Sequence, residues 1–489
     1  MEETTTVTYT ADQTPAASTR YRQAYHFTPP AGWLNDPNGL IFYRGQYHIF
    51  YQSNPYTPQW NSMHWGHALS DDLILWQHLP TALAPDQPYD NDPKGGCFSG
   101  TSIEHEGVLY LFYTGSFHRG KDQVQVQCMA YSSDGVHFEK YSKNPVLTAP
   151  DGYSAANFRD PKVWKQDETF YLLCSGQKNN RAVLLLYRSL DLFHWEFFNI
   201  MMESRGELGA MWECPDFYPL DGKYVLTISP IGLGDRKAMY FTGDMDYRTG
   251  RFHPQVCGEV NWGMDFYAAQ TMVDESQKRI CIGWANGWDW MPWWKNFGNT
   301  QSEGWCGAFN LPREVRLTRD HTLKFLPVEG IKRYQSVTAE AGNITIEHGK
   351  YPIDTRQNPC FELKLAVDLK RTTAESFELL LRSGQNLATR VHFDLAHGEA
   401  VFDRNHSDGF SAGRCRCPLK CVGHTLLIDL FSDNSSIELF TDDYETCMSC
   451  NIYPSRSQTE NYIECTEGIL YVEQLNCWEI NINSFKTED

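Results

Sequence analysis

Five segments of this 489-residue chain repeat one pattern of polar and apolar residues. Each begins with a polar, loop-like stretch, continues into an apolar run, turns at a short charged stretch, and ends in a second apolar and aromatic run. The five segments are NDPNGLIFYRGQYHIFYQ, FSGTSIEHEGVLYLFYTG, FRDPKVWKQDETFYLLCSG, ECPDFYPLDGKYVLTIS and FYAAQTMVDESQKRICIGWANG. Two runs rich in β-branched and aromatic residues on either side of a tight turn are typical of a β-hairpin. The chain is therefore expected to repeat one β-hairpin unit five times.

The spacing of these units indicates a β-propeller. Their second runs start at Tyr47, Leu109, Phe170, Tyr224 and Ile280, at intervals of 62, 61, 54 and 56 residues. A second motif, S-x-D-x-x-x-aromatic, recurs at residues 70–76, 132–138 and 189–195. Strand-rich repeats of this length match propeller blades of about four strands. Residues 25–325 are thus predicted to form a five-bladed β-propeller, and the fold class is all-β.

The rest of the chain loses this repeat. After residue 334 it shows alternating runs such as ITIEHGKY, FELKLAVDLK, SFELLLRS and TLLIDLF. Short strands without helical periodicity predict a C-terminal β-sandwich over residues 335–489. Residues 1–24 are predicted to be a polar N-terminal extension, because they lack the basic start and apolar core of a signal peptide. No apolar run reaches the 18 residues that a membrane-spanning helix needs, so no membrane partner is expected.

Net charge and cysteine usage limit the partners. A net charge of −19 without any Lys/Arg run would repel a phosphate backbone, which argues against nucleic acid. Fifteen cysteines, an odd number scattered along the chain, fit reduced thiols in the cytoplasm. A zinc site is conceivable where cysteines cluster, but the one-residue gap of CRC is unlike the usual C-x₂₋₄-C spacing. Buried strand thiols are the favoured interpretation, and no metal or cofactor is expected. The clustered cysteines are Cys415, Cys417, Cys421, Cys447 and Cys450.

Carboxylates recur at one position of the predicted blades. Asp36, Asp160 and Glu213 precede the second runs of their hairpins by 11, 10 and 11 residues. Ser99 holds the equivalent place in the second repeat, and Tyr267 is a looser match in the fifth. Equivalent positions on the innermost strands of successive blades converge on the propeller axis. The three carboxylates are therefore expected to line one funnel.

Carboxyl groups around a water-accessible funnel favour glycoside hydrolysis, which needs a proton donor and a second carboxylate facing the sugar. A separation of about 5–5.5 Å gives a covalent intermediate and retention, and crowding at the axis favours that spacing. The sequence neighbours of Glu213 are apolar, which favours its protonated form and the role of acid. Asp36, among amides, is expected to be an ionised nucleophile. Asp160, next to Arg159, is expected to stay charged and to hold sugar hydroxyls.

The motifs WLNDPNG, FRDP and ECPDFY resemble the three signature motifs of glycoside hydrolase family 32, the invertase and fructan hydrolase family. CFSGT, LPREVRL and a C-terminal stretch are also similar to its bacterial sucrose-6-phosphate hydrolase branch, so the resemblance covers almost the whole chain. It implies a five-bladed propeller with a β-sandwich, and a retaining attack on β-D-fructofuranosides by nucleophile Asp36, transition-state stabiliser Asp160 and acid/base Glu213. The expected substrate-binding residues are Trp33, Asn35, Gln52, Trp60, Phe98, Ser99, Arg159, Tyr267 and Trp288.

The sequence leaves the exact substrate open. A β-fructofuranosidase acting on sucrose or sucrose 6-phosphate is the first hypothesis, and a hydrolase of short fructo-oligosaccharides is the close rival. Five tryptophans between Trp284 and Trp294 suggest the second, because Trp290, Trp293 and Trp294 would extend a sugar platform unless they only pack beneath the loop.

Two further interpretations are weaker. A catalytically inactive fructan-binding protein is disfavoured because no carboxylate is replaced by an amide, and an inverting arabinose-specific furanosidase because of the motif at residues 33–39. A phosphorylated substrate would need a local basic patch in so acidic a chain. The loop cations available for one are Lys94, His118, Arg119 and Lys121. Oligomeric state is left open.

Overall fold

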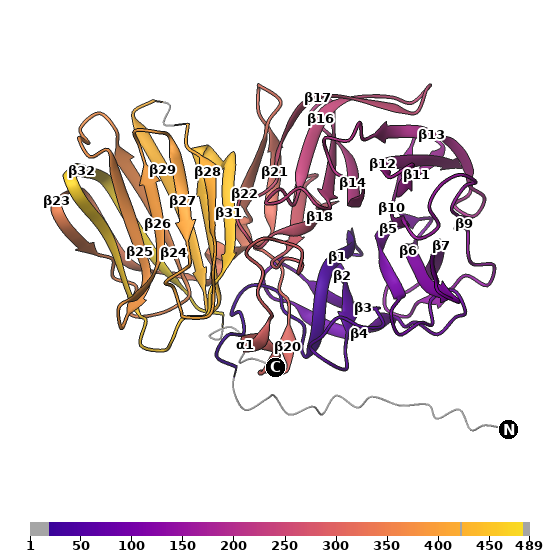
Figure 1. The fold of residues 1–489 in the computed structure, drawn as a ribbon, viewed down its shortest axis with the longest axis horizontal. Coiled ribbons are helices and arrows are strands. Elements are labelled where there is room, and N and C mark those ends of the chain that lie inside the picture. The colour runs from indigo at the N-terminus through magenta and orange to yellow at the C-terminus, as the bar shows by residue number, and fades with distance from the viewer. Residues whose placement is uncertain (1–18, 421–422, 483–489) are drawn as a thin grey trace.

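The structure is a computed structural model that describes residues 19–420 and 423–482. Five antiparallel sheets surround a common axis and form the predicted propeller, and a β-sandwich follows it (Figure 1). Blade 1 contains β1 (Gly32–Tyr43), β2 (Gln46–Asn54), β3 (His64–Ser70) and β4 (Gln77–Leu83). Blade 2 contains β5 (Gly96–His105), β6 (Val108–Arg119), β7 (Asp122–Ser132), β8 (Glu139–Lys140) and β9 (Leu147–Thr148).

The remaining three blades follow the same four-strand plan. Blade 3 contains β10 (Phe158–Gln166), β11 (Thr169–Lys178), β12 (Arg181–Ser189) and β13 (Glu196–Glu203). Blade 4 contains β14 (Trp212–Leu220), β15 (Lys223–Pro230), β16 (Met239–Asp246) and β17 (Arg251–Glu259). Blade 5 contains β18 (Tyr267–Val273), β19 (Arg279–Trp284), β21 (Arg313–Leu317) and β22 (Leu323–Pro327).

The first strand of each blade is the innermost one, as the register argument required. β1, β5, β10, β14 and β18 contact one another in turn, and β18 returns to β1. A segment from blade 5 also reinforces the closure: after the short helix α1 (Gly298–Gln301), strand β20 (Trp305–Cys306) pairs in parallel with β1. No sequence pattern predicted this extra strand.

The repeated S-x-D-x-x-x-aromatic motif is a turn between the third strand of a blade and the segment that follows. The hydroxyl of Ser70 accepts the backbone N–H of Leu73 at 2.8 Å, and Asp72 accepts that of Ile74 at 2.9 Å. Ser189 and Asp191 repeat the arrangement in blade 3. Side-chain oxygens thus satisfy the backbone of a tight turn, and the motif is structural.

The 3-10 helix η1 (Glu329–Tyr334) links the propeller to the sandwich. The long strand β32 is shared between two layers, since it pairs first with β25 and then with β24. Apolar side chains of both layers, such as Leu379, Phe393, Leu363 and Leu430, are fully buried between them. The elements of the sandwich are β23 (Gln335–Pro352), β24 (Phe361–Asp368), β25 (Ser376–Gly384), β26 (Leu387–Asp394), β27 (Glu399–Asp403), β28 (Arg414–Pro418), β29 (Thr425–Asp433), β30 (Ser436–Thr441), η2 (Asp442–Tyr444), β31 (Thr446–Asn451) and β32 (Glu460–Ile480).

The sandwich packs against blade 5 (Figure 1), and the start of the described chain runs along this junction. The backbone N–H of Ala24 donates to Asp433 at 2.7 Å. The His26 ring lies 2.8 Å from Asp433 and 3.3 Å from Glu438, and Glu438 also pairs with Arg313 of blade 5 at 2.6 Å. Most of the predicted N-terminal extension lies outside the described residues, as does Cys421. In the portion that is described, no helix has the length and apolar character to cross a membrane.

Candidate active site

A β-bulge interrupts the innermost strand of every blade at the position that the sequence analysis singled out. The pairing of each first strand with its neighbour shifts register once near the start of the strand: between Leu34 and Pro37, Phe98 and Gly100, Arg159 and Lys162, Glu213 and Asp216, and Tyr267 and Gln270. A bulge releases a residue from the ladder and re-aims its side chain. The common spacing of these residues in the sequence therefore corresponds to five bulges, one in the innermost strand of each blade.

The bulges in three blades hold the backbone in the left-handed region. φ is 61° at Asp160, 49° at Cys214 and 53° at Ala268. Residues with side chains avoid this region at a cost of about 1–3 kcal/mol each, and such strain persists where the surrounding structure enforces it. Blades 3, 4 and 5 thus share one strained conformation at the floor of the funnel.

The three predicted carboxylates meet in one cavity of about 610 Å³. Asp36 accepts its hydrogen bonds at one oxygen: Ser99 donates its hydroxyl to Oδ2 at 2.6 Å, and the thiol of Cys214 lies 3.4 Å from the same oxygen. Oδ1 has no hydrogen-bond partner within the described chain. Burial raises the pKa of Asp36 to about 6, and the negative charge of Glu213 adds to the shift.

Asp160 is fixed at both its backbone and its side chain. Its N–H donates to Thr114 Oγ1 at 2.9 Å, and its Oδ2 accepts the backbone N–H of Cys214 at 2.8 Å. Burial raises the pKa of Asp160 to about 7, although the nearby Arg159 lowers it. Cys214 therefore contacts both aspartates, through its thiol and through its backbone.

Glu213 has polar surroundings, which corrects the expectation of an apolar environment. Arg159 donates Nε and Nη2 to Oε1 at 3.1 and 3.0 Å, and the hydroxyl of Tyr267 donates to Oε2 at 2.6 Å. The Glu213 side chain is 21% exposed, whereas that of Asp160 is 6% exposed. Apolar residues adjacent in the strand do not surround the carboxyl group, because side chains from neighbouring blades reach it first.

Arg159 also differs from its predicted role. It was expected to keep Asp160 charged, yet its nearest contact with that carboxylate is 4.0 Å while it binds Glu213 at 3.0 Å. Asn157 and Gln125 accept its Nη1 at 3.0 and 3.3 Å and hold the guanidinium in this direction. The bulge at Asp160 separates two adjacent side chains that the sequence placed together.

The structure brings most of the predicted substrate-binding residues to this cavity. Its wall includes Trp33, Asn35, Gln52, Trp60, Phe98, Ser99, Arg159 and Trp288. Tyr267 is the exception: it is buried, lies behind Glu213 and does not line the cavity. Its hydroxyl donates a hydrogen bond to the Glu213 carboxylate.

The tryptophan-rich loop after β19 divides into wall and core. Trp288 and Trp294 line the cavity, and Trp288 stacks with Trp33 at 6.4 Å between ring centroids. Trp293 is 8% exposed and donates its ring N–H to the backbone of Met264, so it belongs to the core. Trp290 is 37% exposed and lies outside the lining. Only part of the proposed platform faces a substrate.

Further side chains, most of them polar, complete the wall. The lining residues that were not among the sequence candidates are Gln59, Gln123, Gln125, Ala156, Asn157, Asp289, Asn296, Phe297 and Gln301. The alternation in DQVQVQ (residues 122–127) is a signal that could have identified two of them, because it puts Gln123 and Gln125 on one face of β7. The others lie on loops or, for Gln301, in the four-residue helix α1, and these segments carry no periodic pattern.

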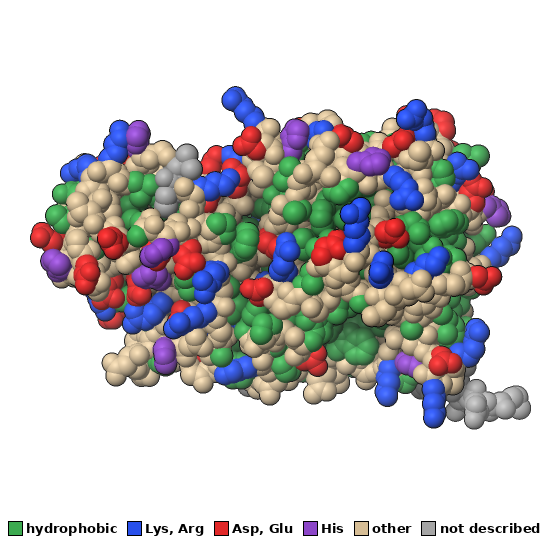
Figure 2. Space-filling view, turned by 45° about the horizontal axis from the view of Figure 1, so that its top comes forward, with side chains coloured by type: hydrophobic (Ala, Val, Ile, Leu, Met, Phe, Trp, Pro, Cys, Tyr) green, Lys and Arg blue, Asp and Glu red, His purple; other side chains and the backbone are tan. Residues whose placement is uncertain are grey.

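Charge in the cavity is predominantly negative. Four carboxylates line it, including Asp289, against the single guanidinium of Arg159. The loop cations considered for a phosphate, Lys94, His118, Arg119 and Lys121, are not among the lining residues. His118 instead pairs with Asp92 at 3.0 Å. On the face shown in Figure 2, basic side chains are scattered among acidic ones without forming a continuous patch.

The cysteine cluster forms no metal site among the residues that are described. Cys417, Cys447 and Cys450 are buried in the sandwich, and Cys415 lies 3.6 Å from Cys450 between their sulfur atoms. Burial raises the pKa values of Cys417 and Cys450 well above that of a free thiol. Neutral thiols packed in strands are poor ligands, as the preferred interpretation of this cluster assumed.

The model of the glycosyl hydrolases family 32 N-terminal domain matches residues 26–327, and that of the family's C-terminal domain matches residues 331–479. The chain belongs to glycoside hydrolase family 32. It is 33% identical to the sucrose-6-phosphate hydrolase of Zymomonas mobilis, over 96% of this chain and 95% of that protein. It is 34% identical to the raffinose invertase of Escherichia coli, over 93% and 94%.

A solved family 32 structure also resembles this chain along most of its length. The β-fructofuranosidase of Bombyx mori, solved as a mutant in complex with sucrose, is 34% identical, covers 95% of both chains and superposes with a TM-score of 0.79. Family membership makes this protein a glycoside hydrolase. The three carboxylates at the axis are its candidate catalytic groups.

Proposed function

We propose that this glycoside hydrolase is a retaining β-fructofuranosidase that releases the terminal β-D-fructofuranosyl unit of sucrose. The main support for this proposal is that Asp36, Asp160 and Glu213, from three blades, line one cavity and that Cys214 contacts both aspartates. We assign Asp36 as nucleophile, Glu213 as acid/base and Asp160 as stabiliser of the oxocarbenium-like charge. The Bombyx mori enzyme in complex with sucrose supports this choice of sugar, whereas the Zymomonas mobilis relative is named for the phosphate ester.

In the first step the carboxylate of Asp36 attacks the anomeric carbon of the fructosyl unit. Ser99 and Cys214 both contact Oδ2 and hold this carboxylate in place at the cavity. Glu213 transfers its proton to the glycosidic oxygen, the bond to the departing sugar breaks, and a fructosyl ester of Asp36 remains. The partial exposure of Glu213 places it where a leaving group and water have access.

In the second step Glu213 accepts a proton from water, the water oxygen attacks the anomeric carbon, and the ester bond breaks to restore the Asp36 carboxylate. Arg159 and Tyr267 donate to the carboxylate form of Glu213 that this step requires. The crowding that raises the pKa values of Asp36 and Asp160 supports a resting site that holds a proton near neutral pH.

The charge of the cavity favours a neutral sugar over sucrose 6-phosphate. A phosphate would approach four carboxylates with only Arg159 to offset them, and Arg159 is already bound to Glu213. Short fructo-oligosaccharides remain the alternative substrate, supported by Trp288 and Trp294 in the wall.

Hydrolysis of sucrose, sucrose 6-phosphate and kestose under identical conditions tests this choice. We expect the highest kcat/KM with sucrose. A preference for the phosphate ester would contradict the charge argument, and a preference for kestose would favour the oligosaccharide alternative. Proton NMR should detect β-fructofuranose as the first-formed product, since double displacement retains configuration. First formation of the α-anomer would exclude the covalent mechanism.

We propose residues 25–325 as the catalytic domain and 335–489 as the sandwich domain, supported by the family-model boundaries. We also propose a cytoplasmic location, since an oxidising compartment would join thiols as close as those of Cys415 and Cys450. Counting free thiols in protein purified without reductant from its native cells tests this location. A Cys415–Cys450 disulfide in that protein would contradict it.

A further inference from the structure

We infer that the sandwich domain positions the acid side of the active site, because Arg404 and Asn451 hold both strands of the innermost hairpin of blade 5 at its open end. The inference rests on the proposed acid/base role of Glu213. It concerns residues that contact no part of the cavity where the chemistry takes place.

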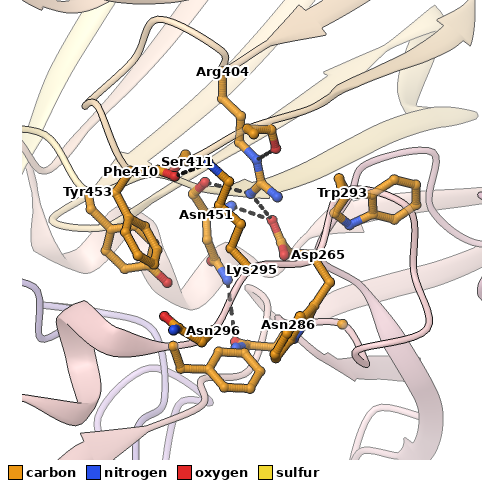
Figure 3. Close-up of a pocket in the computed structure, with 14 residues that line it drawn as sticks. Asp265, Asn286, Trp293, Lys295, Asn296, Arg404, Phe410, Ser411, Asn451 and Tyr453 are labelled. Carbon is orange, nitrogen blue, oxygen red and sulfur yellow. Dashed lines mark hydrogen bonds and ion pairs between the residues drawn. The ribbon is translucent and has the colours of Figure 1, made fainter.

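The first strand of the hairpin, β18, is held through Asp265, which lies two residues before Tyr267. Oδ2 of Asp265 accepts Nη1 of Arg404 at 2.6 Å and the backbone N–H of Asn451 at 2.7 Å (Figure 3). Asp265 also donates its own N–H to the backbone oxygen of Ser449 at 2.9 Å. Asp265 and Arg404 are 7% and 6% exposed, so water does not compete for these bonds.

The second strand of the hairpin, β19, is held by the side chain of Asn451. Its Nδ2 donates to the backbone oxygen of Ala285 at 2.7 Å, directly after β19 ends at Trp284. Tyr267 and Trp284 are paired at the open end of the hairpin, so one asparagine of the sandwich bonds beside both strands at that end. Arg404 binds the backbone oxygen of Asn451 at 2.8 Å and completes the clamp.

The hairpin carries groups that reach the reacting atoms. Tyr267 donates its hydroxyl to Oε2 of Glu213 at 2.6 Å, so the position of the hairpin sets the direction of that carboxyl group. The loop that leaves Ala285 brings Trp288 and Trp294 to the cavity wall. Lys295, further along the loop, donates to the backbone oxygen of Phe410 of the sandwich at 2.8 Å (Figure 3).

The directional hydrogen bonds of Arg404 indicate that this contact positions the hairpin and does more than hold the two domains together. A buried ion pair adds little net stability compared with well-packed apolar residues, so adhesion alone does not require one. The fork of Arg404 instead joins three acceptors in fixed geometry: Asp265 Oδ2, the oxygen of Asn451 and that of Ala412. Arg404 is therefore a positioning residue that acts on Glu213 through Tyr267.

The test compares Arg404→Met with Tyr267→Phe on two substrates, sucrose and 4-nitrophenyl β-D-fructofuranoside, whose leaving group departs without a proton. A misplaced catalytic group costs as much as roughly a hundredfold in rate. We expect kcat on sucrose to fall by about ten- to a hundredfold in either variant, with at most about a threefold loss on the aryl fructoside. In the double variant the losses should not add, because both act on the same carboxyl group.

The matched control is Arg382→Met. Arg382 is a buried arginine of the sandwich whose side chain bonds to backbone oxygens of Gln458 and Asp433, within the sandwich. The Arg382→Met variant should be less stable than wild type, and any loss of its kcat should be the same for both leaving groups. Arg404→Lys, which keeps the charge but not the fork, should recover part of the rate on sucrose.

Equal losses on both substrates for Arg404→Met, or additive losses with Tyr267→Phe, would overturn the inference. If Arg404→Met does not fold, Asn451→Ala carries the same test, because it removes the side-chain bond to Ala285 and leaves the ion pair in place. Wild-type protein that cleaves neither substrate would overturn the proposed function itself, which no Arg404 result can imitate.

Discussion

Two clusters of buried charge in this protein have opposite electrostatic character. At the propeller axis, burial raises the pKa values of Asp36 and Asp160 to about 6 and about 7. At the junction with the sandwich, the pKa of Glu438 falls to about 2 against its desolvation, because Arg313 and His26 bind it. The first cluster holds charges that the fold would be more stable without. The second holds charges that are matched by partners.

The difference follows from what each cluster must do. A nucleophile cannot have its charge fully matched by hydrogen bonds, and Oδ1 of Asp36 has no hydrogen-bond partner within the described chain. Asp433 has no such task and accepts bonds from His26 and from the backbone of Ala24. Unpaired charge and strained backbone mark the catalytic site, and saturated hydrogen bonding marks the structural one.

Asp36→Asn should give the largest effect and the clearest separation of function from stability. We expect kcat to fall by about 10⁴- to 10⁶-fold, as for loss of other nucleophiles. The thermal midpoint should rise, because the ionised carboxylate is destabilised by up to about 3 kcal/mol, given its pKa shift from 3.8 to about 6. Assays with calorimetry check both. A variant that keeps a tenth of the activity, or unfolds earlier than wild type, contradicts this assignment.

Glu213→Gln should separate proton donation from ring stabilisation within the axial cluster. Sucrose cleavage should fall by about 10²- to 10⁴-fold, the usual contribution of a general acid, because a departing sugar oxygen needs a proton. The rate of the same variant on an aryl fructoside should fall much less, because that leaving group departs without a proton. Asp160→Asn should impair both substrates alike, since the ring charge develops whatever leaves. Steady-state kinetics on both substrates would disprove the assignment if Glu213→Gln lost the same factor on each.

Glu438→Gln makes the matched carboxyl-to-amide change at the junction and should act with opposite sign. It leaves Arg313 and His26 buried without their shared anion, a loss of about 3–5 kcal/mol of stability. Because Glu438 lies away from the cavity, kcat of the folded enzyme should stay within about threefold of wild type. Urea unfolding followed by tryptophan fluorescence measures the stability. Unchanged stability would mean that the junction charges are not matched as described.

The acid limb of kcat/KM should report the axial cluster. Asp36 must be ionised to attack, so activity should fall about tenfold per pH unit below its pKa of about 6. The raised pKa of Asp160, about 7, should begin the decline earlier. A pH profile on sucrose, measured where the protein stays folded, checks this. Full activity at pH 4.5 would show that neither carboxyl group is shifted in the free enzyme.

The stability of the junction should depend on pH in the other direction, with the smallest of these effects. The pKa of His26 rises from 6.5 to about 9 through its bonds to Asp433 and Glu438, against its desolvation. Its contribution is therefore complete below pH 6.5 and is lost as the pH rises through about 9. Thermal midpoints of wild type and His26→Gln, compared between pH 6 and 9.5, should converge at the alkaline end. A constant difference between them would contradict this linkage.

The repeat alone was sufficient to predict the blades and the place of the carboxylates. Strand periodicity and turn chemistry are local properties, and a repeated local unit has few ways to pack other than around an axis. The common register of Asp36, Asp160 and Glu213 therefore predicted their convergence, which the five innermost strands confirm. The turns built on Ser70 and Ser189 were visible in sequence for the same reason.

Contacts between blades and between domains were decided only by the tertiary structure. Adjacent residues suggested that Arg159 serves Asp160 and that apolar groups enclose Glu213, yet the bulges turn Arg159 and Tyr267 toward Glu213. Likewise nothing local shows that Arg404 lies against Asp265, 139 positions earlier. A side chain's direction at a bulge, and its partner across a domain junction, depend on backbone angles and packing that no single segment contains. Sequence therefore determined which residues reach the axis, and tertiary structure determined what each of them binds there.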